Sequence, residues 1–267
     1  MIKKLLLIVF TVIVSFPAIS QTDFKTWASA GINFSLSKRL GLRLNYLTSY
    51  NMSDNFINTF SQSSASFSYN VSKRFSTLGG AMITRFPSDS DPTYRYFVRV
   101  SYKLPVAHLV TWSNGIQAEQ HSLSETRFRN RIIYITRFSN SKRFDFLNLS
   151  LSASYWLFYN MGGNRLRYFE KTGEVVARNT PDGFHRGRLY LTANSKVTDN
   201  FSVSLYYMHQ QEFNLFSNQF RQINVTNPST GRISRAFDNY NVTGVSLFCN
   251  LDLYQNSKHK SSSKHKK

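Results

Sequence analysis

Apolar and polar residues alternate along most of the chain after its first twenty residues. In residues 27–36, alanine, isoleucine, phenylalanine and leucine stand at every second position, and serine, glycine and asparagine fill the positions between them. The alternation recurs in residues 40–46, 64–71 and 94–102. Successive side chains of a strand point to opposite faces of a sheet, so this pattern predicts long β-strands with one apolar face.

Short polar turns separate the predicted strands at a regular spacing. The tripeptide Ser-Lys-Arg occurs at 37–39, 72–74 and 141–143, and we expect further turns at 103–105 and 198–200. The first four turns lie about 35 residues apart, which fits a hairpin followed by a longer loop. We expect the longer loops at residues 51–60, 87–93, 120–124, 160–183 and 214–237.

The two longest loops contain turn sequences of their own. Residues 171–173 read Lys-Thr-Gly, and residues 227–231 read Asn-Pro-Ser-Thr-Gly. Glycine-containing turns of this kind predict small hairpins that project beyond the main sheet.

The strands are long, and their connections differ at the two ends of the sheet. They run to 10–14 residues, whereas strands of soluble proteins have about five or six. Short turns at one end, long loops at the other, and Phe and Tyr near the strand ends are typical of outer-membrane barrels. We therefore predict an all-β fold, an antiparallel up-and-down transmembrane β-barrel over residues 21–254. A secreted β-sandwich and a lipocalin-like barrel are the alternatives.

Two considerations, the residue pattern and the even strand numbers of bacterial barrels, bear on the number of strands. The pattern gives eleven strands, but bacterial single-chain barrels have even numbers of strands. We therefore expect 10–12 strands, with ten or twelve in the closed barrel and twelve favoured.

The two ends of the chain differ from the barrel in composition. Residues 1–20 read as a signal peptide, because Lys3 and Lys4 precede a short apolar run and Ala18-Ile19-Ser20 provides small residues for cleavage. Residues 255–267 contain mostly Ser, Lys and His and are expected to form a basic, disordered tail. Export together with a barrel predicts the outer membrane of a Gram-negative bacterium.

Charge and cysteine content narrow the expected partners. The formal net charge is +19, which favours anionic partners, and for an exported chain these are outer-membrane lipids, not nucleic acid. The single cysteine, Cys249, excludes an internal disulfide. The sequence has neither a phosphate-binding glycine loop nor a zinc-binding Cys/His spacing, so we predict no cofactor and no metal.

Arginines alternate with other residues in 125–137, which we expect to form a strand with its basic face toward the lumen. A turn between residues 140 and 141 would place Arg131, Arg129, Arg127 and Glu125 opposite Ser150, Ser152, Ser154 and Trp156. The hairpin at 198–200 would place Arg186 opposite Glu212 and Arg188 opposite Gln210. The resulting candidates for lumen and selectivity residues are Arg95, Arg99, Glu119, Glu125, Arg127, Arg129, Arg131, Arg186, Arg188 and Glu212.

These charged residues allow a structural and a functional interpretation. Arg and Glu can form ion-paired ladders that fill a narrow barrel, and we favour this interpretation. Alternatively, the arginines form a constriction that selects small anionic solutes.

Catalysis has little support in the sequence. His121 with Ser122 and Ser124, and His209 with Glu212, are the only hints of a lipid hydrolase. Neither group stands in a nucleophile motif, so we assign no catalytic residue and expect no enzyme.

The chain resembles an uncharacterised family of Gram-negative outer-membrane β-barrels of the Bacteroidetes type. The resemblance rests on the signal segment, Trp27 in the first strand, the repeated Ser-Lys-Arg turns and the segment 125–131, Glu-Thr-Arg-Phe-Arg-Asn-Arg. That family is classed only as a domain of unknown function, so it implies a fold and a location but no reaction. Three hypotheses follow: a narrow, anion-leaning channel, a structural or interaction barrel acting through its long loops, and a lipid-modifying hydrolase.

Overall fold

The computed structural model describes residues 23–107 and 109–254. The predicted signal peptide at 1–20 and the predicted basic tail at 255–267 lie outside these residues.

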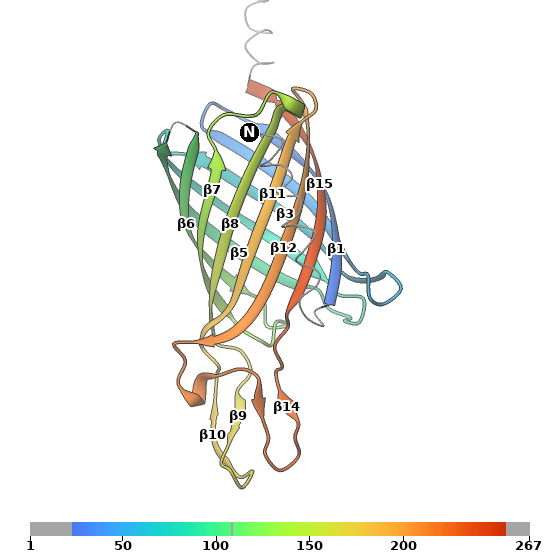
Figure 1. Ribbon diagram of the computed structural model, residues 1–267, viewed down its shortest axis with the longest axis vertical. Coiled ribbons are helices and arrows are strands. Elements are labelled where there is room, and N and C mark those ends of the chain that lie inside the picture. Colours follow the sequence, from blue (N-terminus) through green and yellow to red (C-terminus); the bar gives the residue numbers. More distant parts are fainter. Residues whose placement is uncertain (1–22, 108, 255–267) are drawn as a thin grey trace, which may run out of the picture.

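Eleven long strands close into one barrel (Figure 1). The wall strands are β1 (Asp23–Ser35), β2 (Leu40–Asn51), β3 (Ile57–Asn70), β4 (Phe75–Arg85), β5 (Thr93–Ala107), β6 (Val110–His121), β7 (Asn130–Asn140), β8 (Leu149–Met161), β11 (Gly183–Lys196), β12 (Phe201–Leu215) and β15 (Tyr240–Asp252). Each strand pairs with its neighbours along the chain, so the topology is up-and-down as predicted.

The barrel closes through a parallel pair of strands. β1 and β15 run side by side in the same direction, from Asp23 opposite Tyr240 to Ser35 opposite Asp252, whereas the other wall pairs are antiparallel. An odd number of alternating strands leaves the first and last pointing the same way, so eleven strands require this arrangement. The eleven strands of the pattern, within the expected range of 10–12, are confirmed, whereas the preference for an even number of strands was wrong. The additional strands of the long loops form separate hairpins and do not enter the wall.

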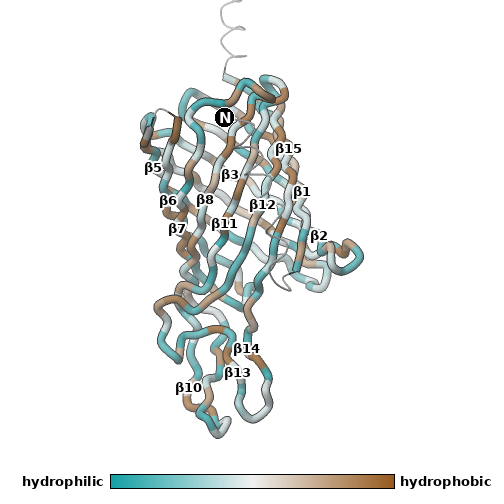
Figure 2. The backbone as a smooth tube through the Cα atoms, viewed as in Figure 1, coloured by the Kyte–Doolittle hydropathy of each residue, from teal (hydrophilic) through white to brown (hydrophobic). Residues whose placement is uncertain are grey.

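The outer wall is apolar and the inner face is mostly polar. On β5, Tyr96 and Val98 are exposed on the outside, whereas Arg95 and Arg99, on either side of them in the sequence, point inward. Figure 2 shows this alternation as hydrophobic and hydrophilic residues following one another along the strands. Lipid cannot form hydrogen bonds with backbone groups, so a closed sheet with this outer face is the form in which strands can cross a membrane.

Serine side chains stabilise two of the short turns at one end of the barrel. Ser37 Oγ accepts hydrogen bonds from the backbone N–H groups of Arg39 and Leu40, at 3.1 and 3.0 Å. Ser72 Oγ accepts equivalent bonds from Arg74 and Phe75, at 3.2 and 3.0 Å. The repeated tripeptide therefore specifies the same turn twice.

The predicted turn at 198–200 joins β11 to β12, whereas the predicted turns at 103–105 and 141–143 differ from expectation. Residues 103–105 continue β5, and the pairing shifts near Pro105, which has no N–H for the ladder. After β7, a longer connection contains a 3₁₀ turn (η2, Phe146–Asn148) and a bridge between Phe144 and Leu149.

This longer connection changes the pairing of β7 with β8. Arg131 lies opposite Asn160 instead of Ser150. β7 begins only at Asn130, so Glu125, Arg127 and Arg129 lie in the loop 122–129, outside the β7–β8 ladder. The predicted pairings with Ser150, Ser152, Ser154 and Trp156 were wrong.

The two long loops form the small hairpins that the sequence predicted. They are β9 (Leu166–Phe169) with β10 (Val175–Asn179), and β13 (Val225–Thr226) with β14 (Ile233–Ser234). Both project from the end of the barrel opposite the short turns (Figure 1). They pack around the short helical turn η3 (Gln219–Arg221), where the Tyr168 hydroxyl donates to the Gln222 carbonyl at 3.2 Å.

No helix within residues 23–107 and 109–254 is long and apolar enough to cross a membrane.

A charge placed on the middle of the outer wall tests the orientation of the strands. We expect Val98→Arg to lower the free energy of unfolding in phospholipid vesicles by about 2–4 kcal/mol, because the guanidinium must enter the hydrocarbon. Val71→Arg, at the rim beside the short turn, should cost about 0–1 kcal/mol. Urea unfolding followed by tryptophan fluorescence measures both values. Equal costs at the two positions would contradict a lipid-facing outer wall.

Candidate functional site in the barrel lumen

A cavity of about 460 Å³ lies inside the barrel toward the long loops. Seven cationic side chains and three carboxylates contribute to its lining. The cations are Lys25, Arg95, Arg99, Arg127, Arg131, Arg186 and Arg188, and the acids are Glu119, Glu125 and Asp238. Eight of the ten predicted lumen residues therefore line one cavity. Glu212 and Arg129 do not belong to the lining.

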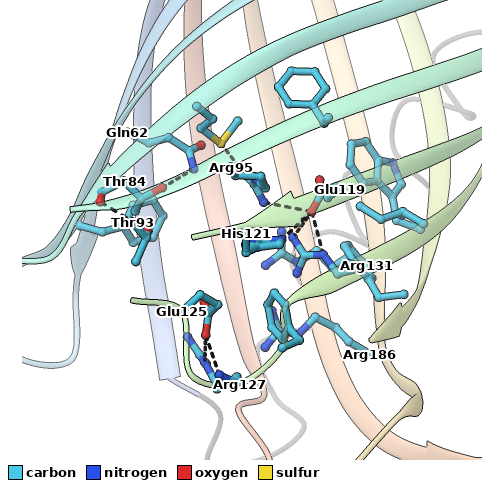
Figure 3. A pocket seen from close by; sticks show the side chains of 18 of the residues that line it. Gln62, Thr84, Thr93, Arg95, Glu119, His121, Glu125, Arg127, Arg131 and Arg186 are labelled. Carbon is cyan, nitrogen blue, oxygen red and sulfur yellow. Dashed lines mark hydrogen bonds and ion pairs between the residues drawn. The ribbon is translucent and has the colours of Figure 1, made fainter. Parts of the chain in front are cut away.

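Glu119 is the centre of the most extensive charge network in the cavity. Its Oε2 accepts hydrogen bonds from Arg131 Nε at 2.8 Å and Nη2 at 2.6 Å, and from Arg95 Nη1 at 3.4 Å. His121 Nε2 lies 3.2 Å from the same oxygen, and Gln117 Nε2 donates to Oε1. Figure 3 shows Arg95, His121 and Arg131 converging on this carboxylate. Both Glu119 and Arg131 are buried, so the network forms a packed strut across β5, β6 and β7.

A second ion pair forms across β11 and β12 as the sequence predicted. Arg186 lies opposite Glu212 in the ladder, and its guanidinium donates to Glu212 Oε1 through Nε at 2.9 Å and through Nη2. Glu212 Oε2 also accepts from the backbone N–H of Asp238 at 3.0 Å. The pairing of Arg188 with Gln210 is confirmed too.

The loop 122–129 folds over the mouth of the cavity. Phe128 is only 3% exposed, and its ring packs against His121 and under the guanidinium of Arg131. Arg127 lies 3.5 Å from Glu125 and 3.9 Å from Asp238. Arg129 instead donates to the carbonyls of residues 122 and 125, so it fixes the shape of the loop.

Two other loops hold this loop in place. Gly163 has a φ of +98°, and a Cβ at this position would lie 2.6 Å from the carbonyl of Arg127, so only glycine allows the approach. Arg235 Nη1 donates to that carbonyl at 3.0 Å. Burial lowers the pKa of the Arg235 guanidinium to about 10, and it stays charged at neutral pH. Neither contact could be predicted from the residue pattern.

Arg99 and Arg188 differ from the other wall arginines of the cavity because glutamines, not carboxylates, hold them. Arg99 Nε donates to Gln117 Oε1 at 2.7 Å, and Arg188 Nε donates to Gln210 Oε1 at 2.7 Å. Neither arginine belongs to an ion pair within the described residues. A glutamine orients a guanidinium without neutralising its charge.

Aromatic rings support these two guanidinium groups. Arg99 lies 5.1 Å from the centre of the Trp156 ring, and Arg188 lies 5.3 Å from that of Phe158. Trp156 and Phe158 are themselves in contact on the inner face of β8. The rings hold both cations through the π face, so neither cation is held by direct contact with a carboxylate.

The cationic lining continues toward the short turns. Arg43 and Arg137 occupy inward positions of β2 and β7, and Arg43 Nε donates to Asn33 Oδ1 at 2.6 Å. Between the ends of the wall strands the only acids are Glu119 and Glu212, and both are already paired with arginine. The alternation of inward and outward residues along β2 and β7 could have identified Arg43 and Arg137, but the predicted set of lumen residues does not contain them.

The histidine groups considered for hydrolysis are not arranged as catalytic pairs. The hydrogen bonds of the described residues join Ser122 to Ser124 and to the N–H of Tyr94, and they join His121 to Glu119. His209 bonds Asn241 on the opposite face of β12 from Glu212. The described residues also contain no group of three acidic, His or Cys side chains that could hold a metal ion.

A closed sheet with an apolar outer wall and a charged, polar interior defines a membrane β-barrel. Over residues 24–221 the sequence matches the family described as "Protein of unknown function (DUF2490)", and the chain belongs to this family. The resemblance to a barrel family of unknown function is thereby confirmed. A comparison with curated proteins found no match.

The chain is similar at low identity to several solved structures, among them the following three. The NanC porin is 12% identical, with a TM-score of 0.45, over 84% of this chain and 98% of its own. A variant of OccD1 (OprD) is 8% identical, with a TM-score of 0.30, over 70% of this chain and 50% of its own. OmpT, an outer membrane protein of Vibrio cholerae, is 10% identical, with a TM-score of 0.28, over 79% of this chain and 63% of its own.

The network at Glu119 predicts a large stability effect. We expect Glu119→Gln to lower the free energy of unfolding by about 3–5 kcal/mol, because the buried Arg131 then lacks a counter-charge. Replacing both partners, as in Glu119→Leu/Arg131→Met, should recover much of this loss. Glu125→Gln is the control and should cost about 0–1 kcal/mol, because Arg127 is 43% exposed. Equal losses in Glu119→Gln and Glu125→Gln would contradict the structural role of the network.

Proposed function

We propose that this protein is an integral outer-membrane β-barrel that passes small anionic solutes through a narrow lumen, with Arg99 and Arg188 as the selective site. The observation that carries the proposal is the pairing of these two arginines with glutamines instead of carboxylates. Outer-membrane lipids would surround the apolar outer wall.

The charge distribution divides the arginines into two groups. Arg131 and Arg186 form close ion pairs with Glu119 and Glu212, and Arg95 shares Glu119 with Arg131, so these three arginines serve to hold the wall together. Arg99 and Arg188 retain net positive charge in a confined space of low dielectric constant. A pore lined by cations of one sign attracts anions and repels cations.

The position of the two arginines suits a constriction. The aromatic side chains of Trp27, Phe97, Trp156, Phe158 and Tyr190 contribute to the same cavity lining. Toward the short turns the inward positions are mainly serine, glycine and asparagine, which leave more free cross-section. An anion would therefore meet the guanidinium groups among bulky aromatic side chains.

The loop 122–129 limits the size of the solute. It covers the mouth with Phe128, and it is held there by Gly163, Arg235 and the ion pair of Arg127 with Asp238. This arrangement favours small solutes and low conductance.

Planar-bilayer recordings across a salt gradient test the proposal. We expect the folded protein to give discrete, anion-selective currents. The double variant Arg99→Gln/Arg188→Gln should reduce the anion-to-cation permeability ratio by about threefold or more, because two uncompensated charges leave the constriction. Conductance should persist, since glutamine is no larger than arginine.

Lys171→Gln/Arg232→Gln is the matched control, because it removes the same charge from the projecting loops. It should leave the permeability ratio unchanged. Cation-selective currents from the unaltered protein, or unchanged selectivity in the arginine variant, would overturn the proposal.

A second function, binding of a partner through the projecting hairpins, is favoured by one observation. Tyr168 and Ile223 are 2% and 1% exposed, so the two hairpins form a packed unit and not a pair of loose loops. Silence of a demonstrably folded barrel in bilayers would direct attention to this unit.

A further inference from the structure

The short-turn end of the barrel carries a crescent of positive charge. Its members are exposed side chains of three connections between β1 and β8 and of the adjoining end of β5, and we refer to them together as the basic rim: Lys38, Arg39, Lys73, Arg74, Lys103 and Lys142. Strands β1 to β8 are neighbours in the wall in this order, so the turns follow one another around the barrel (top of Figure 1).

Backbone hydrogen bonds join each turn to the next. The Arg39 carbonyl accepts from the N–H of Asn70 at 2.8 Å, and the Arg74 carbonyl accepts from that of Lys103 at 2.8 Å. The N–H of Ser141 donates to the Leu109 carbonyl at 2.9 Å. The cations therefore stand on a continuous, ordered edge.

No member of the basic rim forms an ion pair within the described residues, although Asp145 lies on the same connection as Lys142. Among the ion pairs of the described residues, the pair at this end is Lys196 with Asp199, and it involves no member of the rim. By contrast, Arg127, Arg186 and Arg221 near the long loops each pair with a carboxylate. Adjacent like charges repel one another, so an anionic partner would stabilise this arrangement.

An apolar collar lies directly against the basic rim. Exposed aromatic and aliphatic side chains flank the same turns, and they are Tyr69, Val71, Phe75, Tyr102, Leu109, Phe144 and Phe146. This collar is continuous with the apolar outer wall. Aromatic side chains with cations beyond them occupy the level at which phospholipid head groups meet the hydrocarbon.

We propose that the basic rim binds the phosphate groups of anionic phospholipids in the leaflet next to the short turns. Arginine forms two parallel hydrogen bonds with a phosphate, and lysine contributes a point charge. A soluble acidic protein would match the charge, but it would not require the apolar collar. The inference is independent of whether the lumen conducts.

Spin-labelled lipids provide a direct test with the full folded barrel in phosphatidylcholine vesicles. Electron paramagnetic resonance measures how strongly labelled phosphatidylglycerol is enriched over labelled phosphatidylcholine in the lipid shell around the protein. We expect about twofold or greater enrichment at low salt, with most of it lost at 0.5 M NaCl, where the Debye length is only about 4 Å.

Charge removal at the two ends of the barrel separates the possible sources of enrichment. Lys38→Gln/Arg39→Gln/Lys73→Gln/Arg74→Gln should bring the enrichment close to one. Arg165→Gln/Arg167→Gln/Lys171→Gln/Arg178→Gln removes the same charge from the β9–β10 hairpin and should retain it. If the fourfold rim variant does not fold, Lys38→Gln/Arg39→Gln should show a partial loss.

No enrichment in the unaltered protein would overturn the inference. So would full enrichment in the folded rim variant, or equal loss in the hairpin variant. The last result would assign lipid attraction to overall charge and not to the rim.

Discussion

The closed hydrogen-bonded sheet is the constraint on which the rest of this structure depends. Lipid offers no partner to backbone N–H and C=O groups, so every wall strand must pair on both sides. Eleven strands achieve this only through the parallel contact of β1 with β15. Closure then assigns the two faces of every strand. Apolar residues mostly face lipid, and Glu119, Glu212 and most of the wall arginines face the interior, where their charges must be compensated or used.

The interior of the wall has few acids, and each of them is bonded to arginine. Glu119 takes the guanidinium groups of Arg95 and Arg131, and Glu212 takes that of Arg186, so the two internal carboxylates of the wall are committed to structure. Arg99 and Arg188, by contrast, are held by glutamines and rings. The same chemistry thus gives a rigid wall and a local excess of positive charge. The structural and functional interpretations of the arginines therefore apply to different residues.

The sequence predicted the features that follow from the two-residue alternation of strands and from local turn chemistry. Strand alternation identified Arg95, Arg99, Glu119, Arg186 and Arg188 as inward, and the symmetric hairpin at 198–200 gave the correct pairing of Arg186 with Glu212. Prediction from the sequence failed where the geometry depends on contacts between residues far apart in the chain. A 3₁₀ turn shifted β8 relative to β7, and the alternation of arginines in 125–131 proved to belong largely to a loop. Charged residues can alternate in a loop that distant groups such as Gly163 and Arg235 hold in place.

The central claim is that the lumen holds uncompensated cations that attract anions. Crystals of the folded barrel soaked in bromide test it most directly, because anomalous scattering locates the bound halide. The account predicts bromide within hydrogen-bonding distance of the Arg99 and Arg188 guanidinium groups, and none beside Arg131, whose charge Glu119 neutralises. A lumen without bromide, with Arg99 and Arg188 turned toward carboxylates, would contradict it.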